Sequence, residues 1–256
     1  MRGSAQVALL PSVPRARRAV VAAVLSAGLT AGLVSCSEAE DPDKGTNGLG
    51  KLPAAEIENQ ARAAAAEAKS VSLSGTLVSK GGTYKLNMRL KDDGGTGSVT
   101  AGDNTFELLR VADDLYLKAD AGFWAPSAKS DADAEAVEKL EGKYVKVPEG
   151  DPAYDQFRGF TDKDALLDGF LGMTGELSKG DRTKIGGVRT IQVSAGEGAG
   201  GVLDVSLEGA PYPLQFARAG GGGVLTLGRW GEDFPLAAPP TSATVDYGKS
   251  LPKTID

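Results

Sequence analysis

The feature that most constrains the fold of this chain is a change of hydrophobic period at Val71. From there to Lys118, apolar and polar residues alternate in short runs separated by turn residues. The clearest run is 84–91, where Tyr, Leu, Met and Leu alternate with Lys, Asn, Arg and Lys. Such alternation is typical of a β-strand that buries one face. Successive runs at this spacing predict an antiparallel meander, and its apolar face needs a cover.

A second group of strands is expected from about Thr183 onward, again joined by turns that contain glycine. The predicted strands are 71–77, 84–91, 97–101, 105–111, 115–118, 144–147, 189–193, 202–207, 214–218, 224–227 and 243–247. The glycine-rich segments 196–201 and 220–223 do not lie between a strand and a helix of a βαβ unit. We therefore interpret them as hairpin turns rather than phosphate-binding loops.

Three helices are predicted, one before these strands and two between them. The first covers 53–69, with Pro53 in its first turn and a face made largely of alanine. The second covers 131–140. The third follows a capping box at Thr161-x-x-Asp164 and ends at Gly172. Helices first and in the middle, with two runs of strands, indicate an antiparallel α+β domain of about 9–11 strands and about three helices.

The N-terminal segment has the four parts of a lipoprotein signal peptide, in order. Four arginines and no acidic residue precede an apolar run of 14 residues, Ala19 to Gly32. Leu33-Val34-Ser35-Cys36 then matches a lipobox, and an acidic segment follows. An apolar run of this length is typical of a signal peptide and short for a membrane span. We predict a signal peptide over 1–35, lipidation of Cys36 and a flexible acidic tether over 36–52. The Arg17-Arg18 pair leaves both twin-arginine and general secretory export open.

The composition of the mature chain narrows its function. From Cys36 to the end, 24 basic residues face 34 acidic ones, a formal charge of −10. Such a charge disfavours both nucleic acid and anionic lipid headgroups as partners. We therefore expect the lipid on Cys36, rather than a basic patch, to hold the protein at the membrane. The chain has no histidine, which removes the commonest general base and metal ligand. Asp131–Glu135 lacks the glycine and spacing of an EF-hand. No catalytic site, metal site or cofactor is predicted.

The layout and the closing motifs of the chain resemble a known family. These motifs are Pro211-Tyr212-Pro213 before a strand, the Trp230-Gly231 turn that leads to Phe234, and Ala238-Pro239-Pro240. Together with the lipobox, the first helix and the two meanders, they resemble the actinobacterial lipoproteins of the LppX/LprG type, whose fold is similar to that of the LolA/LolB carriers. The resemblance implies a curved, half-open antiparallel barrel with helices over its concave face. It also implies an apolar cavity for acyl chains.

The residues expected to line this cavity are apolar and come from strands and helices alike. They are Leu86, Met88, Leu90, Phe106, Leu108, Phe160, Leu166, Leu167, Phe170 and Leu171. The pattern alone leaves open whether they enclose a cavity or fill a dry core. Five aromatic residues are candidates for exposure, although most of them are expected to lie in the core: Trp124, Tyr154, Phe157, Phe160 and Trp230. We interpret the segment from Tyr154 to Phe160 as a loop that forms a mobile mouth.

These observations predict a lipoprotein on the extracytoplasmic face of the cell membrane, with one domain over 53–256. Its expected role is to bind or transfer lipid or glycolipid acyl chains, without catalysis and as a monomer. The alternative is a non-catalytic surface lipoprotein that binds a protein or cell-wall partner. The sequence does not distinguish a carrier from a sensor, and it does not identify the ligand.

Overall fold

The fold is a large sheet with helices on one face, seen in a computed structural model that describes residues 41–79, 82–124 and 137–246. The elements are η1 (Leu49–Lys51), α1 (Ala54–Glu67), β1 (Ser70–Ser79), β2 (Gly82–Lys91), β3 (Gly94–Ala101), β4 (Asn104–Val111), β5 (Asp114–Ala119), α2 (Ala121–Trp124), β6 (Tyr144–Val147), α4 (Pro152–Thr161), α5 (Lys163–Leu171), β7 (Leu177–Ile185), β8 (Val188–Ala195), η3 (Gly196–Gly198), β9 (Gly201–Ser206), β10 (Pro213–Ala217), η4 (Ala219–Gly221), β11 (Gly223–Gly228), η5 (Thr241–Ala243) and β12 (Thr244–Asp246).

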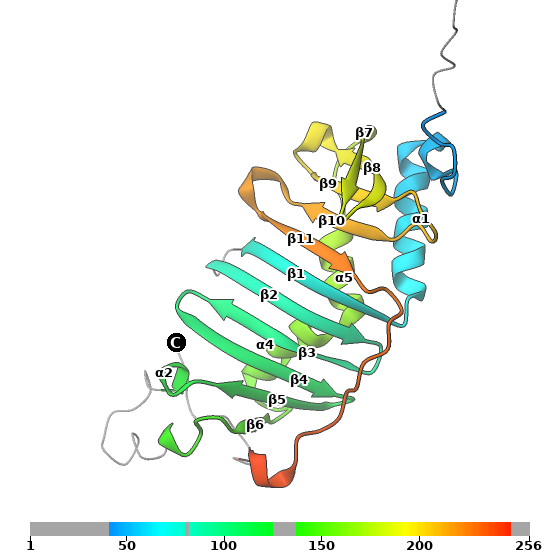
Figure 1. The fold of residues 1–256 in the computed structure, drawn as a ribbon. Coiled ribbons are helices and arrows are strands. Elements are labelled where there is room, and N and C mark those ends of the chain that lie inside the picture. Colours follow the sequence, from blue (N-terminus) through cyan, green and yellow to red (C-terminus); the bar gives the residue numbers. More distant parts are fainter. Residues whose placement is uncertain (1–40, 80–81, 125–136, 247–256) are drawn as a thin grey trace, which may run out of the picture. The chain divides into compact units, whose positions relative to one another are not determined.

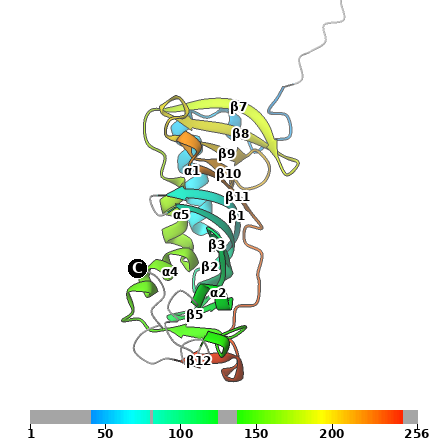
Figure 2. The same ribbon diagram turned by 90° about the vertical axis from the view of Figure 1, so that its left-hand side faces the viewer.

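The described strands form one sheet of 12, in the order β12-β6-β5-β4-β3-β2-β1-β11-β10-β9-β8-β7. Two meanders, β1 to β6 and β7 to β11, meet where β1 pairs antiparallel with β11. Among the strands that the structure describes, only β12 pairs in parallel, with β6. The sheet is curved and its edges do not close on each other (Figure 2). The predicted α+β class and half-open antiparallel sheet are confirmed. The sheet has one strand more than the upper limit of the predicted range of about 9–11.

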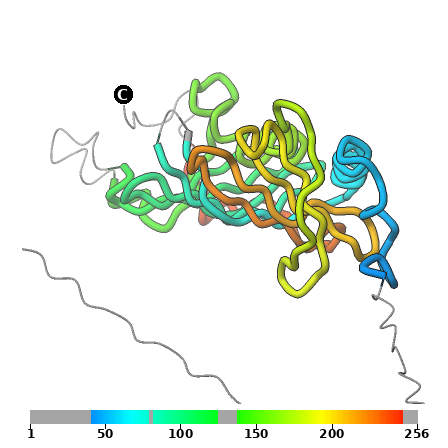
Figure 3. The backbone as a smooth tube through the Cα atoms, turned by 90° about the horizontal axis from the view of Figure 1, so that it is seen from above, coloured from blue at the N-terminus to red at the C-terminus, as the bar shows by residue number. Residues whose placement is uncertain are grey.

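The helices cover the concave face of the sheet (Figure 3). Ile57, Ala61 and Ala65 of α1 are fully buried, so the predicted alanine face does approach the sheet closely. In α5, Leu166, Leu167, Phe170 and Leu171 are buried, as predicted, and Gly172 is the C-cap. Helix and sheet side chains form one continuous hydrophobic core.

The opposite face of the sheet is polar. Paired positions on five adjacent strands carry Asp204, Gln215, Thr226, Ser74 and Asn87, each directly across from the next. Because successive side chains of a strand point to opposite faces, the apolar residues between these polar positions point toward the helices. The alternation of the sequence thus determines which face of the sheet receives the cover.

The connection after β11 crosses the polar face (Figure 1). Its anchor is Phe234, which is buried beneath two cations: the Arg89 guanidinium lies 4.3 Å and the Lys91 ammonium 4.7 Å from the ring centre. Ser70 Oγ donates to the Glu232 carbonyl oxygen at 2.7 Å. These contacts hold the closing segment against the sheet that it crosses.

The domain begins earlier than the predicted boundary at Pro53. The described residues from Asp41 onward belong to one compact unit. Leu49 is buried in the common core, and Asn47 Nδ2 donates to the Ser206 carbonyl oxygen at 3.1 Å. The flexible tether predicted for 36–52 is therefore wrong from residue 41 onward, because long-range hydrogen bonds hold that polar segment on the domain.

Other local predictions also need correction. The segment from Tyr154 to Phe160 is not a loop: it lies within helix α4, whose N-cap Asp151 accepts from Ala153 N at 2.9 Å. The N-cap of α5 is Asp162, one residue after the predicted Thr161. The first predicted residues of the helix 131–140 lie outside the described part of the chain. Among the described helices, none is both long and apolar enough to cross a membrane.

Candidate functional site

The structure gathers the ten predicted cavity residues on the concave side of the sheet. Nine are buried: Leu86, Met88 and Leu90 from β2, Phe106 and Leu108 from β4, and Leu166, Leu167, Phe170 and Leu171 from α5. Phe160 of α4 is partly buried and packs against the same core. These residues, which lie on separate strands and helices, are thus side by side in one core. Their role toward a ligand stays a prediction, because these residues pack on one another in the core.

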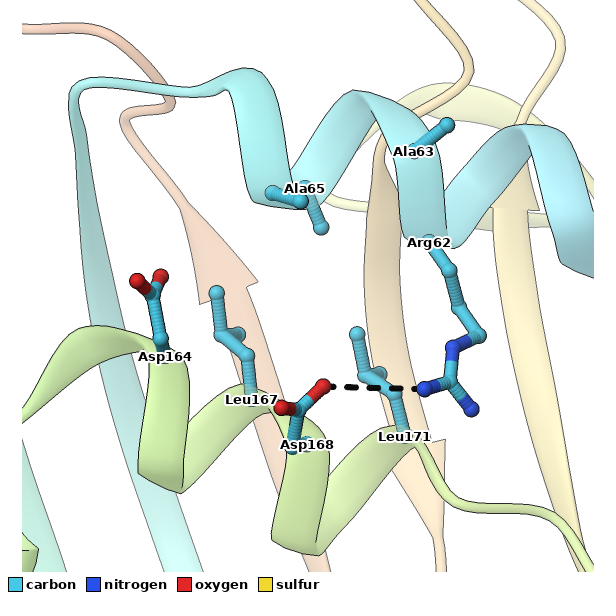
Figure 4. A pocket seen from close by; sticks show the side chains of 8 residues that line it. Arg62, Ala63, Ala65, Asp164, Leu167, Asp168 and Leu171 are labelled. Atoms are coloured by element: carbon cyan, nitrogen blue, oxygen red, sulfur yellow. Dashed lines mark ion pairs between the residues drawn. The ribbon is translucent and has the colours of Figure 1, made fainter.

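Space is found at the edge of this core, between α1 and α5. This α1–α5 groove has a volume of about 450 Å³ and combines an apolar floor with a charged rim (Figure 4). The floor and walls are Ala63, Ala65, Ala66, Leu167 and Leu171, and the rim is Arg62, Asp164 and Asp168. The volume falls within the range of about 300–1,000 Å³ found for small-molecule sites.

The groove exists because α1 presents small side chains where α5 presents large ones. Ala63 and Ala66 are exposed, whereas Leu167 and Leu171 are buried beneath them. An alanine surface on one wall leaves room that a leucine surface would fill. The alanine face predicted from the sequence shares only Ala65 with this groove, and the exposed wall of Ala63 and Ala66 was not predicted.

An ion pair crosses the groove. Arg62 Nη2 lies 3.5 Å from Asp168 Oδ1, and Arg62 Nη1 lies 3.6 Å from Glu58 Oε1. The Arg62 and Asp168 side chains are 43% and 79% exposed, so water screens their attraction. Pairs of this kind contribute at most about 1 kcal/mol. The rim therefore joins the two helices only weakly.

A second pocket lies on another side of α5. It has a volume of about 230 Å³ and is lined by Gly169, Phe170 and Gly172 together with Phe216 and Arg218 from the β10 region. Phe170, like Leu167 and Leu171, belongs to the predicted set of cavity residues. The C-terminal half of α5 is thus bordered by space on two sides.

The N-terminal end of α5 is held by a buried lysine. The Lys163 side chain is 2% exposed, and its Nζ atom lies 2.6 Å from both Asp92 Oδ1 and the Ala68 carbonyl oxygen. It also lies 3.4 Å from the Ala66 carbonyl oxygen. These carbonyls belong to the C-terminal end of α1, where a positive charge is favourable. Lys163 therefore joins α5, α1 and the β2–β3 turn.

A buried arginine holds the junction between α4 and α5. Arg110 of β4 donates from Nε to Thr161 Oγ1 at 3.2 Å and from Nη2 to the Thr161 carbonyl oxygen at 3.0 Å. Its Nη1 donates to the Ala112 carbonyl oxygen at 2.8 Å. Arg110 is 5% exposed, so these three hydrogen bonds satisfy a charge that would otherwise be costly to bury.

A third pocket, of about 560 Å³, lies near the same end of the sheet and is lined mostly by charged residues. Lys69, Lys91, Asp92, Asp93 and Asp233 are among its lining residues. A hydrogen bond from Lys91 to Asp233, at 2.5 Å, lowers the pKa of the Asp233 carboxyl. Cations and carboxylates neutralise one another here, so we assign no ligand to this pocket.

Four aromatic side chains form a cluster beneath α4. The cluster consists of Phe106, Phe123, Trp124 and Phe157, with ring centres 5.4 Å apart for Phe106 and Phe123, 5.5 Å for Phe106 and Phe157, and 5.1 Å for Phe123 and Trp124. All four residues are buried. Among the aromatics predicted as candidates for exposure, Tyr154 is also buried; its hydroxyl donates to the Asp113 carbonyl oxygen, and burial raises its pKa.

The site combines residues that the sequence indicated with others that it did not. The apolar members follow from alternation and helical spacing. The buried cations Lys163 and Arg110 were missed, because charged residues in a pattern are normally assigned to the surface. Cys36, the predicted lipidation site, lies outside the described residues and stays a prediction.

The sheet and its helical cover define a class of fold that occurs among solved structures, although no family model and no curated protein matches the sequence. LprF from Mycobacterium bovis matches with a TM-score of 0.51 and 17% identity, over 73% of this chain and 96% of that one. The lipoprotein LppX from Mycobacterium tuberculosis matches with a TM-score of 0.43 and 12% identity, over 72% of this chain and 98% of that one. The predicted resemblance is confirmed at the level of the fold that this chain shares with LprF.

Proposed function

We propose that this protein is an extracytoplasmic lipoprotein, anchored in the membrane through Cys36, that binds or transfers the acyl chains of a lipid or glycolipid. The observation that carries the proposal is the α1–α5 groove, which joins an apolar floor to a charged rim. An amphiphile needs both, because its chain gains from leaving water while its headgroup must stay solvated or paired.

The groove is also continuous with the predicted cavity residues. Leu167 and Leu171 line it and belong to the common core, so a chain that enters between the helices would meet the apolar surface above the sheet. Each buried methylene contributes about 0.8 kcal/mol, and a pocket of this size is suited to part of one chain rather than to a whole multi-chain lipid. Deeper binding would require α5 to move from α1.

Native mass spectrometry of the signal-free protein, residues 37–256, purified without detergent, tests this function. A discrete lipid that co-purifies and is recovered by organic extraction supports the proposal and identifies the ligand class. A clean apo mass, with rejection of added phospholipids and glycolipids, would instead favour the alternative of a surface lipoprotein that binds a protein or cell-wall partner.

The variant Ala66→Trp gives a sharper test of the groove itself. Ala66 is exposed, so a large ring is tolerated there while it fills the space above Leu167 and Leu171. Ala63→Ser, which barely changes the volume, is the control. The proposal predicts loss of the bound lipid in the first variant and its retention in the second. Equal lipid occupancy in both would exclude the groove as the binding site.

The anchor is tested separately from the ligand. Cys36→Ala should block lipidation and leave the protein as unprocessed precursor or release it from the membrane. If the variant is processed and still resists a high-salt wash, the lipobox assignment is wrong, whatever the protein binds.

A further inference from the structure

Of the three pockets described above, the second is the one whose lining carries a positive charge. This pocket, between the C-terminal end of α5 and the β10 region, is called the β10–α5 pocket, and its one charged lining residue is Arg218. The α1–α5 groove sets Arg62 against Asp164 and Asp168, and the third pocket has two lysines and three aspartates. In a mature chain of formal charge −10, an anion therefore meets the least repulsion at the β10–α5 pocket.

The Arg218 side chain has no partner in the part of the chain that the structure describes. It forms no ion pair there and donates no hydrogen bond. A guanidinium offers five N–H donors in a planar fork that fits a carboxylate. Arg62 differs, because it already lies 3.5 Å from Asp168 and 3.6 Å from Glu58. An anion from outside can thus pair with Arg218 without displacing a carboxylate of the chain.

The β10–β11 turn determines where this side chain lies. Arg218 N donates to the Gly223 carbonyl oxygen at 2.9 Å, and Gly222 N donates to the Ala219 carbonyl oxygen at 3.1 Å. Gly222 has φ −66°, which any residue can adopt, so its backbone does not require glycine. A Cβ atom at Gly222 would lie 2.9 Å from Arg218 Cβ and 3.8 Å from Arg218 Cδ. The missing side chain at this position therefore lets the arginine stem lie along the turn, beside the pocket.

A glycine on the α5 wall keeps the pocket open. Gly169 lies in the last turn of α5, where alanine would be the better helix former. A Cβ atom there would have no neighbour within 4 Å, so packing does not require glycine either. The free space beside Gly169 belongs to the pocket, and a glycine in such a place lets a ligand approach the helix backbone closely. The apolar walls are Phe170 and Phe216, both buried.

We propose that the β10–α5 pocket binds the carboxylate end of a fatty acid, with Arg218 paired to the carboxylate and with Phe170 and Phe216 against the adjoining methylenes. One guanidinium neutralises the single charge of a carboxylate, and the described lining has no second cation for a doubly charged phosphate. Because α5 ends at this pocket, its last carbonyl groups make the helix side slightly negative. The carboxylate should therefore lie on the arginine side and the chain on the helix side.

The size and place of the pocket make it a site of its own. Its volume of about 230 Å³ is below that of sites for drug-sized molecules, so it admits the head and part of one chain. The α1–α5 groove lies on another side of α5 and is lined by different residues. The inference therefore goes beyond the proposed function, which rests on that groove.

Isothermal titration calorimetry of decanoate with the signal-free protein tests the role of the charge. Arg218→Met keeps the unbranched stem and should lower the affinity about fivefold, the factor that a partly exposed charged pair provides. Arg158→Met is the matched control, because Arg158 is also exposed but lines none of the three pockets, and it should bind decanoate as the wild type does. The uncharged 1-decanol should bind the wild type and Arg218→Met equally.

Gly169→Leu tests the space in the pocket. A leucine side chain there fills the pocket, and leucine is a better helix former than glycine, so the melting temperature of the ligand-free protein should not fall. Decanoate binding should nevertheless decrease at least tenfold. Ala165→Leu, on an exposed part of α5 outside the pocket, is the control and should keep wild-type binding.

The possible results separate this inference from the proposed function. A wild type that does not bind decanoate, or wild-type affinity in Arg218→Met or Gly169→Leu, would overturn the inference. Stronger Arg218-dependent binding of decyl phosphate than of decanoate would overturn the carboxylate assignment. In native mass spectrometry, decanoate should bind to protein that still carries its co-purified lipid. One-for-one displacement of that lipid would overturn the separate site while the proposed function stands, whereas Arg218-dependent decanoate binding by a protein that carries and accepts no other lipid would remove the proposed function alone.

Discussion

The substitution Lys163→Met is expected to weaken the fold more than any exposed charge change in the chain. Methionine retains the unbranched apolar stem but removes the ammonium that lies 2.6 Å from the Ala68 carbonyl oxygen and 2.6 Å from Asp92 Oδ1. The change therefore tests the charge at this junction with little change in side-chain volume. It does not alter the α1–α5 groove residues themselves.

The expected loss follows from what each partner can do afterwards. Asp92 is 67% exposed and regains water, so its share is at most about 1 kcal/mol. The α1 carbonyl loses a charged donor in a buried place, which costs about 1–3 kcal/mol. The favourable position of the charge at the end of α1 adds about 0.5 kcal/mol. Together these terms predict a decrease of about 1.5–4.5 kcal/mol in the free energy of unfolding.

Urea unfolding followed by circular dichroism measures this loss, with Lys51→Met as the matched control. Lys51 forms an exposed pair with Asp41 at 3.7 Å, and its removal should change stability by less than about 0.5 kcal/mol. If the two variants are equally stable, the argument that Lys163 joins α5 to α1 is refuted.

Three further changes test other parts of the structure by the same method. Gly75→Ala should cost more than about 1 kcal/mol, because Gly75 has φ +144° and an added Cβ would lie 2.1 Å from the Val224 carbonyl oxygen. Asp162→Ala should cost about 1 kcal/mol through loss of the N-cap of α5, whereas Asp162→Asn should keep most of it. For Glu208, a hydrogen bond from Arg189 lowers the folded-state pKa, so its stabilising effect is present above the ordinary carboxyl pKa and is lost as pH falls through the lowered value. Glu208→Gln should therefore be less stable than the wild type at neutral pH and equally stable in acid, and a difference that persists in acid would contradict this.

Much of the fold follows from the sequence because burial acts on one face at a time. In β2, inward Leu86, Met88 and Leu90 alternate with outward polar residues, and the predicted strand matches the structure. In α5, the apolar stripe was predicted with its end at Gly172. Where the chain has a clear inside and outside, the period alone identifies the element.

The errors occur where that condition fails. The edge strand β7 is exposed along most of its length, so its residues show no alternation and none of the predicted strands covers it. Helix α4 was interpreted as a loop, although Asp151-Pro152 is a good start signal and its aromatics recur every three residues. Asn47 looks like part of a polar tether, yet its acceptor, Ser206, is 159 residues away. Contacts of that kind leave no trace in local composition.

The pairing of β1 with β11 has a consequence for how the chain reaches its native state. Each meander is built from neighbours in sequence and can form early, whereas the seam between them joins segments from opposite ends of the domain. Loop closure makes such pairing slow. Until β11 has been synthesised, the β1 edge is unpaired beside a half-covered apolar face, the state most prone to association with other chains. A chain truncated before Gly223 would therefore leave two separate half-sheets with bare edges, and we expect it to aggregate rather than to fold into a smaller domain.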